Sequence, residues 1–95
     1  MTTTNIQTDT VHALCARIQA AAIKCEAYHV FVDYAGHTSA LTVCVRDSRM
    51  DYSEPVDTWP EPLLYERVYL DADWVDPIAE LTAIIDQLQR LGVEV

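Results

Sequence analysis

The spacing of hydrophobic residues changes twice along this chain, and these changes limit the folds that it can adopt. Near the start, apolar residues recur at intervals of three and four, the spacing of one helix face: Val11, Leu14, Cys15, Ile18, Ala22 and Cys25. From residue 28 to residue 34 they alternate, as in a strand with one buried face. Helical spacing then returns: Ile78, Leu81, Ile84, Ile85, Leu88 and Leu91.

Signals at the helix ends agree with this spacing. Residues 4–7, Thr-Asn-Ile-Gln, resemble a capping box, and the first helix is expected to end near Cys25. The second helix is expected to start at Asp76, because an aspartate can cap free amides and Pro77 suits the first helical position. Gly92 is the expected stop.

Between the helices the sequence predicts three strands. Residues 35–37 form a short turn in which Gly36 is free to adopt positive φ, followed by a second alternating run from Ala40 to Arg46. Residues 48–62 contain three prolines and are predicted to be one long loop, and residues 63–70 form the third strand. The expected order is α-β-β-β-α.

Antiparallel strands with both helices on one face would make a two-layer α+β sandwich, with residues 1–95 as a single domain. The residues expected to face the helices are Val30, Val32, Leu41, Val43 and Val45. The open face, which could pair with another chain, would carry Phe31, Thr42, Cys44, Tyr65, Arg67 and Tyr69. In the third strand, Glu66 has the same alternation as Leu64 and Val68, so burying these two residues also turns Glu66 toward the helices.

Composition favours a folded protein, since 51% of the residues are hydrophobic. No apolar run reaches the roughly 18 to 20 residues that a membrane helix needs, and residues 1–10 do not resemble a signal peptide, so a cytoplasmic location is expected. Cys15, Cys25 and Cys44 have no close pairing motif and are expected to be reduced thiols.

Negative charge is concentrated in one part of the sequence. Residues 1–46 carry three acids and three bases, residues 47–80 carry ten acids and two bases, and residues 81–95 carry two acids and one base. The ten acids are Asp47, Asp51, Glu54, Asp57, Glu61, Glu66, Asp71, Asp73, Asp76 and Glu80. They either keep the protein soluble or form a surface that imitates nucleic-acid phosphates and docks on a basic groove.

Three aromatic residues in this region could be interface anchors or could cover the core. Trp59, in a loop stiffened by prolines, and Tyr52 are open to both interpretations. Trp74 directly precedes the helix cap, and we expect it to pack against Ile78 as a hydrophobic staple.

No catalytic, metal or cofactor site is predicted. His12 and Cys15 are three residues apart on the first helix, but structural zinc sites show paired ligands at close spacing. No third residue is placed to orient a Cys-His pair, and the two glycines cannot form a phosphate-binding loop.

The order α-β-β-β-α resembles that of double-stranded-RNA-binding domains, which need basic side chains near the start of the last helix. Here that position has Asp71, Asp73, Asp76 and Glu80, which would repel phosphate. The resemblance therefore predicts topology, and direct nucleic-acid binding is not expected.

Small size, strong acidity and a polar start at residues 1–4 resemble the inhibitor proteins of phages and mobile elements, including anti-CRISPR proteins. The resemblance implies a non-catalytic inhibitor that binds a basic surface of a nucleic-acid-processing complex. The predicted partner-binding residues are Asp47, Asp51, Glu54, Asp57, Trp59, Glu61, Glu66, Asp71, Asp73 and Asp76. The alternatives are a self-associating scaffold domain that forms a homodimer and an immunity protein against a basic nuclease toxin.

Overall fold

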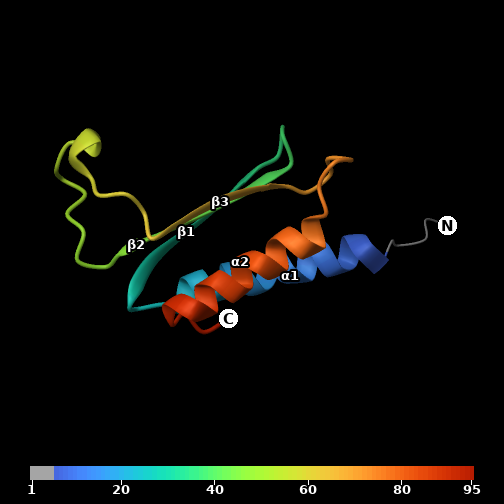
Figure 1. Cartoon of the computed structure of the whole chain (residues 1–95), viewed down its shortest axis with the longest axis horizontal. Helices are drawn as coiled ribbons and strands as arrows, with labels where there is room; N and C mark the ends of the chain where they lie inside the picture. Colours follow the sequence, from blue (N-terminus) through green and yellow to red (C-terminus); the bar gives the residue numbers. More distant parts are fainter. Residues whose placement is uncertain (1–5) are drawn as a thin grey trace.

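The computed structural model describes residues 6–95, with side chains from residue 10 onward. Its elements follow the order α-β-β-β-α, as the sequence predicts: α1 (Ile6–Lys24), β1 (Tyr28–Ala35), β2 (Ala40–Asp47), β3 (Leu64–Tyr69) and α2 (Pro77–Leu91). A short 3-10 helix, η1 (Val56–Thr58), interrupts the long loop. Both helices lie on the same face of the sheet, and the loop extends beyond one end of it (Figure 1).

The sheet is an antiparallel meander in the order β1-β2-β3. Val43 of β2 lies opposite Val32 of β1 and Glu66 of β3, and these residues share the face that the helices cover. Alternation along the strands predicts both faces correctly. Glu66 does point to the helix side, but β3 is an edge strand and the residue remains half-buried, so its carboxylate is not forced into the core.

The core lies between the sheet and the two helices. Its most deeply buried side chains include Ile18 of α1, Val43 and Val45 of β2, and Leu81 and Leu88 of α2. Burying a large aliphatic side chain contributes about 1.5–3 kcal/mol, so this set dominates the favourable term in folding. Helix α1 packs along β1 and α2 along β3, although the helix face of β1 is only partly covered.

The ends of α2 follow the sequence prediction. Oδ1 of Asp76 accepts a hydrogen bond from the backbone N–H of Ala79 at 3.1 Å, and Pro77 is the first helical residue. Gly92 has φ 98° and closes the helix through its own N–H. The capping box predicted at residues 4–7 depends on residues outside the described range.

The β1–β2 turn differs from the prediction in one detail. Across residues 6–95, positive φ occurs at Ser39 and Gly92, and Gly36 does not adopt it. Two successive turn bonds, from Thr38 N–H to Ala35 C=O and from Ser39 N–H to Gly36 C=O, wind the chain in a right-handed sense. Ser39, the last residue before β2, is the residue of this turn that adopts the left-handed conformation, with φ 50°.

Neither helix in residues 6–95 is long and apolar enough to cross a lipid bilayer.

Candidate functional site

The structure divides the acidic residues between two ends of the molecule. β2 runs into the long loop and β3 runs back from it, so the loop and the β3–α2 turn lie at opposite ends of the sheet (Figure 1). A strand of six residues separates them by about 20 Å. We call residues 47–63 the acidic loop and residues 70–76 the acidic turn. The acidic loop holds Asp47, Asp51, Glu54, Asp57, Trp59 and Glu61, and the acidic turn holds Asp71, Asp73 and Asp76.

Trp59 ties the acidic loop to the sheet. Its indole Nε1 donates a hydrogen bond to the backbone carbonyl of Glu54 at 2.9 Å, which closes the loop around η1. The guanidinium of Arg46, on β2, lies 5.2 Å from the centre of the Trp59 ring and donates to the carbonyl of Pro60 at 3.0 Å. Trp59 is half-buried in these contacts, so it folds back onto the sheet and also remains accessible.

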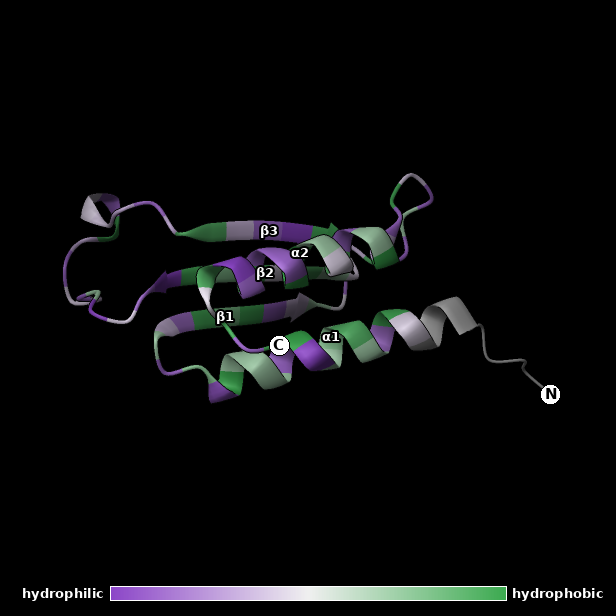
Figure 2. Cartoon of the chain, turned by 60° about the horizontal axis from the view of Figure 1, so that its bottom comes forward, coloured by the Kyte–Doolittle hydropathy of each residue, from purple (hydrophilic) through white to green (hydrophobic). Residues whose placement is uncertain are grey.

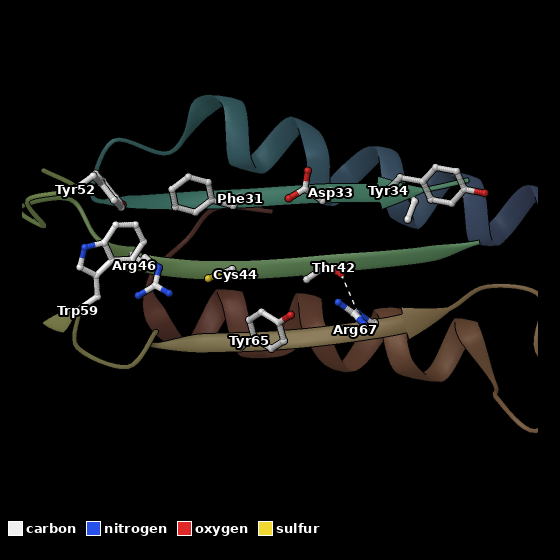
Figure 3. Close-up of a pocket in the computed structure, with 11 residues that line it drawn as sticks. Phe31, Asp33, Tyr34, Thr42, Cys44, Arg46, Tyr52, Trp59, Tyr65 and Arg67 are labelled. Carbon is white, nitrogen blue, oxygen red and sulfur yellow. Dashed lines mark hydrogen bonds between the residues drawn. The ribbon is translucent and has the colours of Figure 1, made fainter. Parts of the chain in front are cut away.

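Tyr52 makes the second attachment between the loop and the sheet. Its hydroxyl lies 2.8 Å from Nδ1 of His29, and its ring stacks on the His29 ring. The same ring meets Phe31 and Trp59 edge-on, with centroid distances of 6.0 and 5.3 Å. We call His29, Phe31, Arg46, Tyr52 and Trp59 the aromatic cluster. It fixes an otherwise irregular loop against the open face of the sheet, and Figure 3 shows its members other than His29.

Two acids of the loop have local structural roles. Arg49 donates from Nε to Oδ1 of Asp47 at 3.1 Å and from Nη2 to Oδ2 at 3.0 Å, which lowers the pKa of Asp47 to about 2. Asp51 accepts from the hydroxyl and the N–H of Ser53, and these bonds lower the pKa of Asp51. The other three loop acids, Glu54, Asp57 and Glu61, are exposed and available to a partner.

The acidic turn is organised differently. Asp76 caps α2, whereas Asp71 and Asp73 are exposed. Trp74, between Asp73 and Asp76, is 83% exposed, so the prediction that it packs against Ile78 is wrong. Val75 lies between Trp74 and the cap and is itself partly buried against the core, so the valine covers the helix start there.

The open face of the sheet forms a hollow of about 590 Å³ beside the aromatic cluster. Phe31, Thr42, Cys44, Tyr65 and Arg67 line it, as the strand alternation predicts (Figure 3). Nε of Arg67 donates to the Thr42 hydroxyl at 3.3 Å, which holds the guanidinium against the sheet. Tyr69 lies further along the same face of β3, opposite Ala40.

Sequence reasoning missed Arg46 and His29 as anchors of the loop. The alternation of residues along the strands places both side chains on the open face, and this was the only sequence signal that they could contact the loop. Their contacts to Trp59 and Tyr52 join residues 13 and 23 positions apart, and no local pattern predicts such pairs. In the part of the chain that is described, no three His, Cys, Asp or Glu side chains come together as metal ligands would.

The fold and these surfaces define a two-layer α+β sandwich with an open aromatic sheet face and two separate acidic ends. Comparisons with protein-family models, with curated proteins and with solved structures found no match.

Proposed function

We propose that this protein is a non-catalytic inhibitor that acts in the cytoplasm by binding a basic surface of a nucleic-acid-processing protein or complex, in the manner of anti-CRISPR proteins. The observation that carries the proposal is the attachment of the acidic loop to the sheet through Trp59 and Tyr52. An acidic loop that served only solubility would need no such attachment.

A fixed loop supports binding because its backbone positions the acidic residues before the partner arrives. Ordering the backbone of a flexible loop on binding costs about 1–2 kcal/mol for each residue that becomes fixed. Here the backbone around Glu54, Asp57 and Glu61 is already held by the η1 turn and the indole hydrogen bond. These three carboxylates are the groups we assign to the contact with lysine and arginine side chains of the partner.

The separation of the acidic residues into two groups limits which of them can contact the partner together. The acidic loop and the acidic turn lie at opposite ends of the sheet, so a compact basic groove would contact one of them at a time. We assign the contact to the loop, because its backbone is anchored and Trp59 offers a half-buried aromatic surface beside the carboxylates.

The test uses the chain and two matched charge variants as baits in extracts of its host, with bound proteins identified by mass spectrometry. The loop variant carries Glu54→Gln, Asp57→Asn and Glu61→Gln. The control variant removes the same number of charges at the other end through Asp71→Asn, Asp73→Asn and Glu80→Gln. The chain and the control should capture a basic nucleic-acid-binding protein, and the loop variant should bind it with about 10- to 100-fold lower affinity.

A second variant separates loop order from loop charge. Trp59→Ala keeps every carboxylate but removes the hydrogen bond to Glu54 and the stack on Arg46. It should weaken capture although the net charge is unchanged, and binding of the unmodified chain should fall steeply with added salt.

Two results would contradict the proposal: equal capture by the loop variant and the chain, or a captured protein that still binds its nucleic acid normally when saturated with this chain. A captured partner that is itself a basic nuclease toxin would support the immunity-protein alternative, which uses the same loop.

A further inference from the structure

Within residues 6–95, β1 is an edge strand with no neighbouring strand on its outer side. The sheet order β1-β2-β3 leaves the backbone groups on that side without a strand to bond, and Figure 2 shows β1 at the margin of the sheet with α1 running alongside. An exposed edge of this kind is a template for pairing with another chain unless the protein blocks it.

The two edges of the sheet are protected to different degrees. β3 has six residues, and it places the charged Glu66 on the helix side, a common device against edge pairing. β1 has eight residues and pairs with β2 in one unbroken register, without a bulge. It contains no proline, glycine or lysine. Of the two edge strands, β1 is therefore the one that is better able to pair with a strand of another chain.

The sequence of β1 is nearly symmetric about Phe31. Residues 28–34 read Tyr-His-Val-Phe-Val-Asp-Tyr, so each residue has a like or complementary residue at the same distance on the other side of the phenylalanine. Two copies of this strand, paired antiparallel with Phe31 opposite Phe31, would place Tyr28 opposite Tyr34 and Val30 opposite Val32. The one asymmetric pair, His29 opposite Asp33, joins a basic and an acidic side chain.

We propose that the occupant of the β1 edge is a second copy of this chain, paired antiparallel about Phe31 to form a continuous six-stranded sheet. In this register every facing pair lies on the same face of the sheet, as antiparallel pairing requires. A shift of two residues sets Phe31 opposite His29 or Asp33, depending on its direction, and removes both His29–Asp33 pairs. The histidine contacts Tyr52 through Nδ1, so Nε2 is the ring nitrogen that we assign to the contact with the second copy's Asp33.

Exposed apolar side chains along β1 also support pairing with a second copy of the chain. Phe31, in the middle of β1, is 43% exposed, and Tyr34, near its end, is 58% exposed. A groove of about 450 Å³ runs between β1 and α1, with Cys15, Ala16 and Val32 in its lining. Facing pairs of valines and tyrosines from a second β1 would cover this surface.

The helix beside the edge presents small side chains there. Ala16 lines the groove, and Ala13 and Ala20 lie three and four residues from it, on the same side of α1 and exposed. Helices approach one another most closely where their contact residues are small. The alanines therefore leave space for α1 of the second copy, which the short spacing between paired strands brings near.

The charges along β1 do not oppose this contact. The strand carries one acid, Asp33, and the proposed pairing places it opposite a histidine. The two-fold axis also sends the two acidic loops to opposite ends of the six-stranded sheet, so their carboxylates do not face each other.

The test is sedimentation equilibrium of the full chain and of two charge variants, His29→Asp and Asp33→Lys. Each variant alone would set like or uncomplementary charges opposite each other twice, and its dimer dissociation constant should rise about tenfold. An equal mixture of the two should restore the affinity, because the introduced aspartate then faces the introduced lysine while native His29 faces native Asp33.

Asp73→Lys is the control, since it makes the same change in net charge as Asp33→Lys but lies in the acidic turn. It should dimerise like the unmodified chain, and circular dichroism should show all variants folded. Hydrogen exchange of β1 amides should slow as the concentration of the unmodified chain rises.

A chain that stays monomeric, a dimer unaffected by both β1 variants, or a mixture that fails to restore affinity would each overturn the proposal. The loop variant that tests the proposed function leaves this dimer unchanged, so the two proposals can fail separately.

Discussion

Two tryptophans in acidic surroundings have different environments because of what lies near them in space. Trp59 has Arg46 below its ring and a backbone carbonyl for its N–H, so it is half-buried. Trp74 is 83% exposed. Both lie next to prolines or acids in the sequence, and neither local context distinguishes them. Only Trp59 is part of the site to which we assign binding.

At the residue scale, the Asp47–Arg49 pair predicts a measurable titration. Arg49 holds the pKa of Asp47 at about 2, below the roughly 3.9 of an unfolded chain. Because the folded-state value is the lower one, the pair stabilises the fold above pH ~4 and this contribution is lost as the pH falls toward 2.

Arg49→Gln should therefore return the pKa of Asp47 toward its usual range, as followed by the carboxyl signal in an NMR titration. Asp51 is the internal control, since Ser53 and not Arg49 lowers its pKa. An Asp47 pKa that does not rise in the variant would show that the arginine contact is not its cause.

At the element scale, the start of α2 depends on one hydrogen bond, from the backbone N–H of Ala79 to the Asp76 carboxylate. Asp76→Ala removes the acceptor for the Ala79 N–H and should reduce the free energy of unfolding by about 1 kcal/mol, measured by urea denaturation. Asp73→Ala removes an equal charge from the same turn without touching the cap, and it should change stability by less than about 0.5 kcal/mol. Equal effects of the two substitutions would indicate a charge effect instead of capping.

At the scale of the whole molecule, stability depends on the core that both helices share with the sheet. Leu88 is fully buried in α2, so Leu88→Ala should lower the free energy of unfolding by about 2–5 kcal/mol. This is a large share of the 5–15 kcal/mol that a domain possesses. Leu63→Ala makes the same chemical change at a residue that is 50% exposed and should cost less than about 1 kcal/mol. Denaturation curves of the two variants make the comparison, and similar losses would contradict the observed core.

The sequence alone determined the helices, the strands and both faces of the sheet, because each depends on spacing within a few residues. Asp76, Pro77 and Gly92 set the limits of α2 for the same reason: caps and stops act through neighbouring backbone groups. Alternation was sufficient to place Val43 inside and Phe31 outside.

Only the tertiary structure decided what the loops do, since their contacts join distant residues. Trp59 packs on Arg46 and Trp74 remains exposed because the sheet passes beneath one of them and not the other. The antiparallel path of β2 and β3 also separated one acidic stretch of sequence into two ends of the molecule. Net charge is a property of composition, but its position on the surface depends on how the strands run.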